Sequence, residues 1–141
     1  MERNEFLRLL GTGTLAVCAG CALQSCSDDA VVASSIPPPT GVDFTLNLTE
    51  PANVALQNVG GSLSKDGLII ARLSTTEFAA LSRSCTHQGT LVNYQNTPMN
   101  FLCPNHGSRF AATGSVINGP AVLPLKKYNT ELTGDSLRVF S

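Results

Sequence analysis

The 141-residue chain contains no tryptophan, only two histidines and few charged residues. Aromatic residues make up 6% of it and charged residues 13%, and the net charge is −1 with no cluster of lysines or arginines. A surface that binds nucleic acid needs basic clusters or stacking aromatic rings, so these absences exclude a nucleic-acid partner. The 43% hydrophobic content excludes intrinsic disorder, and the length suits one domain of ordinary size.

Both histidines and two of the five cysteines fall between residues 84 and 108. They form the motif Cys85-x-His87 and, fifteen residues later, the motif Cys103-x-x-His106. Three kinds of site use such residues: a disulfide, a zinc site or an iron–sulfur cluster. A disulfide suits an exported protein, because thiols oxidise outside the cytoplasm, but it leaves both histidines without a role.

The spacing of the two motifs separates the zinc and iron–sulfur interpretations. A zinc site with two cysteines and two histidines usually takes the cysteines from one knuckle and the histidines from a helix. Here each motif supplies one cysteine and one histidine, and no helix is predicted around them. A 2Fe–2S centre of the Rieske type needs this mixture, since two thiolates bind one iron and two imidazoles bind the other. Two loops on opposite sides of the cluster would meet that need.

The chain after residue 41 has the patterns of β-strands. Residues 42–48 alternate apolar and polar side chains, as a half-buried strand does. Hairpins are predicted over residues 61–74, with Lys65-Asp66-Gly67 at the tip, and over residues 130–140, through Gly134-Asp135. Further strands are predicted within residues 77–84, 91–103 and 108–117. No long helical period occurs, so we expect an all-β domain, sandwich or barrel-like, over residues 42–141.

The N-terminus has the pattern of an export signal. Two arginines occur in the first eight residues, and residues 9–27 are uncharged. The opening resembles a twin-arginine signal in which Asn4 replaces the second arginine. Glycines and threonines make this stretch a poor membrane-spanning helix, although a transmembrane anchor stays an alternative. The pair Cys18 and Cys21 has no charged or histidine partner there, so it has no predicted redox role.

The sequence LQSCSDD resembles a bacterial lipobox, which implies lipidation of Cys26, with Cys21 as the alternative. Residues 1–26 are therefore expected to be an export signal with a lipobox. Residues 27–41 are small and polar, and they end in a proline run that favours an extended tether. The expected location is the bacterial cell envelope, on the periplasmic side of a membrane.

CTHQG and CPNHGS resemble the two motifs of the Rieske iron–sulfur family, and GSVINGPAVLPLKKY is similar to the family's Gly-x-Val stretch and its Gly-Pro-Ala loop, here Gly119, Pro120 and Ala121. The resemblance covers residues 42–141 and is most specific over residues 84–128. It implies a Rieske-type antiparallel β-sandwich with a small cluster-binding subdomain and one 2Fe–2S cluster. It further implies that Cys85 and Cys103 bind the buried iron and that His87 and His106 bind the outer one. The residues implied around the cluster are Gly89, Gly107, Ser108, Phe110 and Pro120.

Two departures from the respiratory members of the family are visible. The two extra cysteines that form a disulfide in those subunits correspond to Thr90 and Asn105 here. Their tyrosine after the glycine–serine pair corresponds to Phe110, so one hydrogen-bond donor to a ligand sulfur is lost. Such donors stabilise the reduced cluster, so we expect a lower reduction potential.

The resemblance implies an electron-transfer protein. Oxygenases of the family need a second iron site with two more histidines, and both histidines of this chain are already used. The leading expectation is a lipid-anchored subunit of a bc-type or related quinol-oxidising complex, with cytochrome b or c and quinol as partners. The alternatives are a small subunit that serves a molybdopterin enzyme and a stand-alone Rieske ferredoxin. A structural zinc or adhesion module is the outsider.

Overall fold

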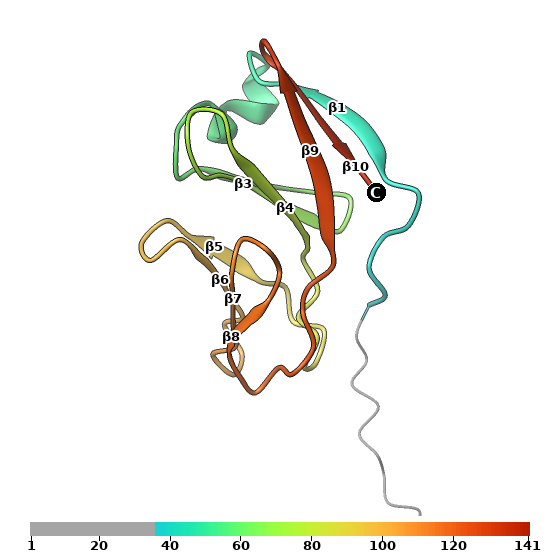
Figure 1. Ribbon diagram of the computed structural model, residues 1–141, viewed down its shortest axis with the longest axis vertical. Coiled ribbons are helices and arrows are strands. Elements are labelled where there is room, and N and C mark those ends of the chain that lie inside the picture. The colour runs from blue at the N-terminus through green and yellow to red at the C-terminus, as the bar shows by residue number, and fades with distance from the viewer. Residues whose placement is uncertain (1–35) are drawn as a thin grey trace, which may run out of the picture. The chain divides into compact units, whose positions relative to one another are not determined.

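The computed structural model describes residues 36–141 (Figure 1). The predicted leader, the lipidation site at Cys26 and residues 27–35 of the predicted tether lie outside the described residues. Within the described part, no helix is long and apolar enough to cross a membrane. Ten strands and one 3-10 helix follow in the order β1 (Asp43–Asn47), η1 (Pro51–Gln57), β2 (Ser62–Lys65), β3 (Leu68–Arg72), β4 (Phe78–Ser82), β5 (Asn93–Gln95), β6 (Asn100–Leu102), β7 (Arg109–Phe110), β8 (Val116–Asn118), β9 (Lys127–Thr133) and β10 (Ser136–Phe140).

The strands form two antiparallel sheets, visible as an upper and a lower group in Figure 1. The larger sheet has the order β1-β10-β9-β4-β3-β2, and the smaller has the order β5-β6-β7-β8. The chain leaves the larger sheet after β4, forms the whole smaller sheet and returns through β9, which pairs with β4. The predicted all-β fold is confirmed, and the smaller sheet is a subdomain inserted between two neighbouring strands of the larger.

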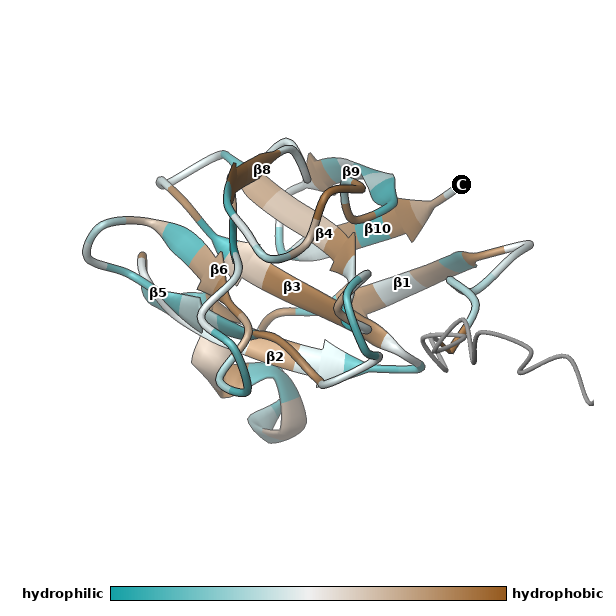
Figure 2. Cartoon of the chain, turned by 90° about the horizontal axis from the view of Figure 1, so that it is seen from below, coloured by the Kyte–Doolittle hydropathy of each residue, from teal (hydrophilic) through white to brown (hydrophobic). Residues whose placement is uncertain are grey.

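Strands β3 and β4 are buried on both faces, because a hydrophobic core lies on each side of them. Successive side chains of a strand point to opposite faces, so Ile70 and Ala80 enter the core of the larger sheet. Ile69 and Leu81 enter the second core, between the two sheets, which also contains Cys85 and Cys103. Figure 2 shows the apolar colouring of β3 and β4. The sequence of each strand is therefore a continuous apolar run, without the alternation of apolar and polar residues seen in strands that are buried on one face only.

The turns follow their predicted chemistry. Asp66 and Gly67 have φ angles of 50° and 79°, which the two-residue turn between β2 and β3 requires. Gly134 has a φ angle of 58° in the turn between β9 and β10. The sequence patterns do not predict the helix η1. Only two of its seven side chains are buried, which is too few to make a helical period visible.

The last six residues of the predicted tether lie against the domain. The carbonyl oxygen of Pro39 accepts hydrogen bonds from the Tyr128 hydroxyl at 2.7 Å and from the Lys126 ammonium at 3.3 Å. Tyr128 is fully buried, and burial raises the pKa of its phenol, so the group is a neutral donor. Next to it, a Cβ on Gly67 would lie 3.0 Å from the Pro39 ring, which leaves little room there for a larger residue. Residues 36–41 are thus fastened to the larger sheet.

Replacing Tyr128 with Phe should loosen this segment. The substitution removes one buried hydrogen bond and keeps the ring, so we expect a loss of about 1 kcal/mol and faster proteolytic cleavage within residues 27–41. The matched control is Tyr94→Phe, since within residues 36–141 the buried Tyr94 hydroxyl has no hydrogen-bond partner. Limited proteolysis with mass spectrometry measures the difference. Equal cleavage of both variants would show that the Tyr128 bond does not hold the segment.

Candidate metal centre

Two loops of the smaller subdomain contain all four predicted ligands. Loop 1, residues 84–91, connects β4 to β5 and is closed at its ends by a bridge between Ser84 and Leu91. Loop 2, residues 103–108, connects β6 to β7, which pair antiparallel. Both loops lie at the lower end of the view in Figure 1.

The two loops repeat one pattern of backbone hydrogen bonds. In loop 1, Cys85 N–H donates to Thr90 O at 2.9 Å and Gly89 N–H donates to Cys85 O at 2.8 Å. In loop 2, Cys103 N–H donates to Ser108 O at 2.8 Å, and Gly107 N–H donates to Cys103 O at 3.0 Å. Each cysteine is therefore held through both of its backbone polar groups.

The pattern requires a glycine at the same place in each loop. Gly89 and Gly107 have φ angles of 74° and 79°, a left-handed conformation that costs other residues about 1 kcal/mol or more. A Cβ on Gly107 would meet no atom within 4 Å, so backbone conformation rather than space explains this glycine. Both glycines were predicted near the cluster, and the structure places them in the loop closures.

The structure places the four predicted ligands as two pairs, one of thiols and one of imidazoles. Cys85 and Cys103 are fully buried in the core between the sheets, and neither forms a disulfide. The rings of His87 and His106 lie with their centroids 4.9 Å apart and their planes at 81°. His87 is half-buried and His106 is exposed. The two thiols thus lie on the inner side of the site and the two imidazoles on the outer side.

The state of the side chains fits a metal cluster. The Nδ1 atom of His87 is buried and has no hydrogen-bond partner among the described residues. Leaving such an atom without a partner costs free energy, and coordination to a metal removes that cost. Within residues 36–141, no three His, Cys, Asp or Glu side chains are grouped as a single metal ion would require. A pair of thiols and a pair of imidazoles are what a 2Fe–2S cluster of the mixed type needs, so the donor set fits such a cluster.

The surroundings of Cys85 favour a bound metal over a free thiolate. Burial raises the pKa of the Cys85 thiol, and the neighbouring Cys103 raises it further. The backbone N–H groups of His87 and Gln88 act in the opposite direction through hydrogen bonds to the sulfur. A cation bound to both sulfurs removes the repulsion between them, and the N–H donors stabilise their negative charge.

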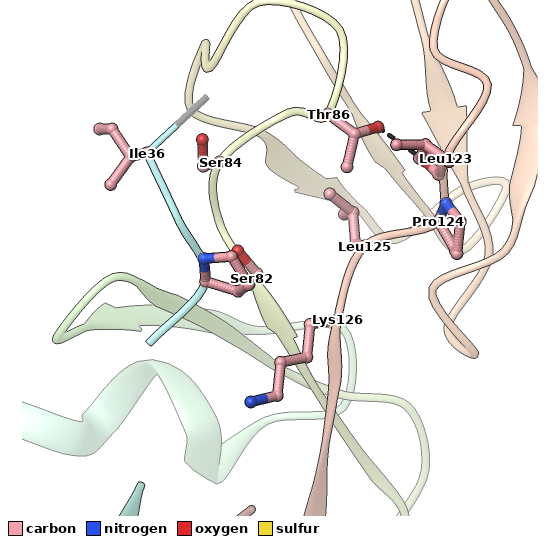
Figure 3. Close-up of a pocket in the computed structure, with 9 residues that line it drawn as sticks. Ile36, Ser82, Ser84, Thr86, Leu123, Pro124, Leu125 and Lys126 are labelled. Atoms are coloured by element: carbon pink, nitrogen blue, oxygen red, sulfur yellow. Dashed lines mark hydrogen bonds between the residues drawn. The ribbon is translucent and has the colours of Figure 1, made fainter. Parts of the chain in front are cut away.

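A third loop, residues 119–125, connects loops 1 and 2. The backbone N–H of Ala121 donates to the buried Ser108 hydroxyl at 2.9 Å, which leaves the hydroxyl proton free for a second bond. The Thr86 hydroxyl donates to Leu123 O at 2.6 Å (Figure 3). Just before this loop, the Asn118 side chain donates to Gly107 O at 3.3 Å. Loop 3 is therefore bonded directly to both ligand loops.

A pocket of about 300 Å³ lies beside these bonds. As Figure 3 shows, Thr86, Leu123 and Ile36 all line it, so the fastened tether segment reaches the ligand loops. Thr86 and Asn118 were not predicted as site residues. Thr86 lies between Cys85 and His87 in the first motif, and this position was the one signal that could have indicated it.

Comparison with known proteins decides the family. A model of the Rieske [2Fe-2S] domain family matches residues 47–129. The cytochrome b6-f complex iron–sulfur subunit of Chlorobaculum tepidum is 33% identical over 133 residues, which cover 93% of this chain and 71% of that subunit. The chain belongs to the Rieske family. The corresponding subunit of Chlorobaculum thiosulfatiphilum is 45% identical over 58 residues, but these cover only 32% of that subunit.

A solved structure agrees with this result. The cyanobacterial plasma membrane Rieske protein PetC3 from Synechocystis PCC 6803 is 31% identical, with a TM-score of 0.51 over 57% of this chain and 85% of the other. This chain therefore carries a Rieske domain with one 2Fe–2S cluster, and it is an electron-transfer protein. When bound, the cluster supplies the ability to take up and release a single electron.

The remaining predicted residues of the Rieske site have different surroundings. Phe110 is fully buried in the core that also contains Cys85 and Cys103. Pro120 is exposed, and its neighbour Ala121 makes the bond to Ser108. Their roles toward the cluster stay predictions.

A side-chain hydrogen bond also spans loops 1 and 2. Asn105 Nδ2 donates to Gln88 Oε1 at 3.4 Å. This bond is long and exposed, so it is a much weaker brace than a covalent bond. The bonds of loop 3 are shorter, and they are the main connection between the ligand loops.

Replacing His106 with Ala should abolish the Rieske visible spectrum and the EPR signal of the reduced state, because the outer iron would lose one of its two imidazoles. Iron and acid-labile sulfide analysis of the purified variant measures the loss. The control is His106→Cys, which supplies a thiolate and should restore iron binding with a different spectrum. A His106→Ala protein with an unchanged spectrum would remove His106 from the ligand set.

Replacing Phe110 with Tyr should raise the reduction potential. A hydroxyl that donates to a ligand sulfur stabilises the reduced cluster, which carries one more negative charge. Such a bond contributes about 1 to 2 kcal/mol, or about 40 to 90 mV for one electron. Protein-film voltammetry checks the shift, with Phe101→Tyr in the same core as the control. An unchanged potential in Phe110→Tyr would show that no donor is formed there.

Proposed function

We propose that this Rieske protein is the electron-carrying subunit of a quinol-oxidising membrane complex of the cytochrome b6-f or bc type. In this proposal, Cys85, Cys103, His87 and His106 hold the cluster, and a lipid on Cys26 holds the domain outside the cytoplasm. When bound by these residues, the cluster would supply one-electron transfer between the quinol site of the complex and a cytochrome.

The observation that carries the proposal is the exposure of the histidine side of the site. His106 is exposed, and Val122 and Leu123 of loop 3 are also exposed. A redox partner can therefore approach the outer ligands directly, and exposed apolar side chains beside a site are typical of a surface that binds a partner. An electron carrier needs such an approach, whereas a structural metal site is closed.

The similar proteins support the membrane complex. The two relatives reported above are iron–sulfur subunits of cytochrome b6-f complexes, and one of the similar solved structures is a plasma membrane Rieske protein. Residues 27–35 lie between Cys26 and the fastened segment that begins at Ile36. Fully extended, they would span about 30 Å, which is enough to keep the domain close to a membrane surface.

Purification of the full-length protein from its own membranes tests the complex. We expect a tagged protein, extracted in mild detergent, to bring a b-type haem with it, and we expect its cluster to be reduced by an added quinol analogue in that preparation. Recovery of a molybdenum enzyme in place of the haem would favour the alternative of a molybdopterin partner. Recovery of the protein alone would favour a stand-alone carrier.

Replacing Cys26 with Ala should release the protein from the membrane. Two or more acyl chains are needed for firm anchoring, so loss of the acylated residue should move the protein to the soluble fraction or leave it as an unprocessed precursor. Mass spectrometry of the wild-type N-terminus and membrane fractionation of both proteins measure this. The matched control is Cys21→Ala, which should be processed normally. An unmodified Cys26 thiol in the mature protein would contradict the anchor.

A further inference from the structure

We infer that the cluster end of the domain binds an acidic surface on its redox protein partner. Here the cluster end means loops 1, 2 and 3 with the residues that flank them. The inference rests on the proposed electron-transfer function, and it concerns the chemistry of the partner rather than the existence of one.

Charge is separated along the chain. Between Phe78 and Thr130 there is no aspartate or glutamate, whereas four cations occur there: Arg83, Arg109, Lys126 and Lys127. Residues 36–77 and 131–141, which form the rest of the larger sheet, contain six carboxylates and three cations. The described domain has a net charge near zero, but its two parts have opposite signs.

The cations of the cluster end are not neutralised. Within residues 36–141 there are two ion pairs, Lys65–Asp66 in the turn beside Arg83 and Arg138–Asp43 between β10 and β1, and neither involves a cation of the cluster end. Arg83, just before loop 1, donates to Val92 O at 3.3 Å, and Arg109, just after loop 2, donates to the Gln95 side chain at 2.8 Å. These partners are neutral oxygens, so each guanidinium keeps its full charge. Lys126, just after loop 3, likewise donates to the neutral Pro39 carbonyl.

Of the four described carboxylates without an ion pair, Glu131 lies within β9 opposite Arg138, and the other three lie at the end of the strands away from the ligand loops. Glu77 precedes β4, and Arg83 follows the same strand, so their backbones are about 20 Å apart. Asp135 lies in the turn beyond β9, and Glu50 is near that turn because Leu48 N–H donates to Asp135 O at 2.8 Å. In Figure 1 this turn is at the top and the ligand loops are at the bottom. The separation exceeds the screening length of about 8 Å at physiological salt, so a partner at the cluster end meets mainly the cations.

The apolar side chains complete a surface of the kind that proteins use to dock. Leu91, Val122 and Leu123 are exposed on loops 1 and 3, among the flanking cations. An apolar centre with a charged rim is the usual composition of a protein interface, and complementary charge increases the rate of association. An anionic lipid surface would also attract the cations. We favour a protein because the exposed His106 has to come close to an electron donor or acceptor.

Two small oxidants of opposite charge test the inference on the full-length, cluster-loaded protein in uncharged detergent. One electron passes from the reduced cluster to hexacyanoferrate(III), a trianion, or to tris(phenanthroline)cobalt(III), a trication, and no proton or group is transferred. We expect oxidation by the anion to slow about tenfold between low and high salt, and oxidation by the cation to accelerate. A rate with the anion that is independent of salt would overturn the inference.

Variants that replace one cation with a neutral residue show which part of the domain causes the charge dependence of the two oxidation rates. Arg109→Gln should lower the anion rate and raise the cation rate, each about twofold or more at low salt. Arg138→Gln removes the same charge from the larger sheet and should change both rates less. A change in potential alone would move both rates in the same direction, so opposite directions indicate docking. Equal effects of the two variants would overturn the inference. If Arg109→Gln fails to load its cluster, Lys126→Gln against the same control answers the same question.

Two further measurements distinguish an acidic protein partner from a lipid surface, and a failure of this inference from a failure of the proposed function. An acidic c-type cytochrome should accept electrons faster than a basic one at low salt. Equal rates, together with pelleting on phosphatidylglycerol but not phosphatidylcholine vesicles, would show that the cations serve a lipid surface instead. If neither oxidant takes an electron from the reduced protein, the proposed function itself is wrong. If both oxidise it at rates that salt does not change, only the acidic partner is wrong.

Discussion

The backbone hydrogen bonds that close loops 1 and 2 are the constraint on which the site depends. Each loop holds a cysteine through its N–H and C=O groups, with a left-handed glycine four residues later. This closure fixes the thiols in the core between the sheets and leaves the histidines, two or three residues further along, on the outer side. The closures are possible because the ends of each loop are paired, by the isolated bridge between Ser84 and Leu91 in loop 1 and by the antiparallel strands β6 and β7 in loop 2. The strands thus fix the positions of the loops, and the loops contain the predicted metal ligands.

Burial of the thiols and exposure of the imidazoles explain how one site can be both stable and accessible. Cys85 and Cys103 pack among apolar side chains, where the sulfurs are protected from water and from oxidation. His106 reaches the surface, where an electron can enter or leave. Loop 3 connects the two ligand loops through hydrogen bonds to Ser108 and Thr86, and these bonds brace the site.

Local patterns in the sequence predicted most of the strands and hairpins, and they predicted that the four ligands lie in two loops. Turn residues such as Asp66 and Gly67 determine hairpins by their own conformational preferences. The two motifs, each with one cysteine and one histidine, contain the four predicted ligands. Contacts between distant residues were not predictable. Thr86 and Leu123 are 37 residues apart, and Pro39 and Tyr128 are 89 apart, so no local pattern connects them. The charge separation was only partly predictable, because only the pairing of β1 with β10 brings Glu50 near Asp135.

The central claim is that two cysteines and two histidines of this chain hold one 2Fe–2S cluster. Pulsed EPR on the reduced full-length protein, grown with ¹⁵N-histidine, tests it most directly. We expect two nitrogen couplings, both changed by the label, together with two irons and two sulfides per chain. A spectrum without histidine nitrogen couplings, or a protein that contains one zinc and no iron, would contradict it.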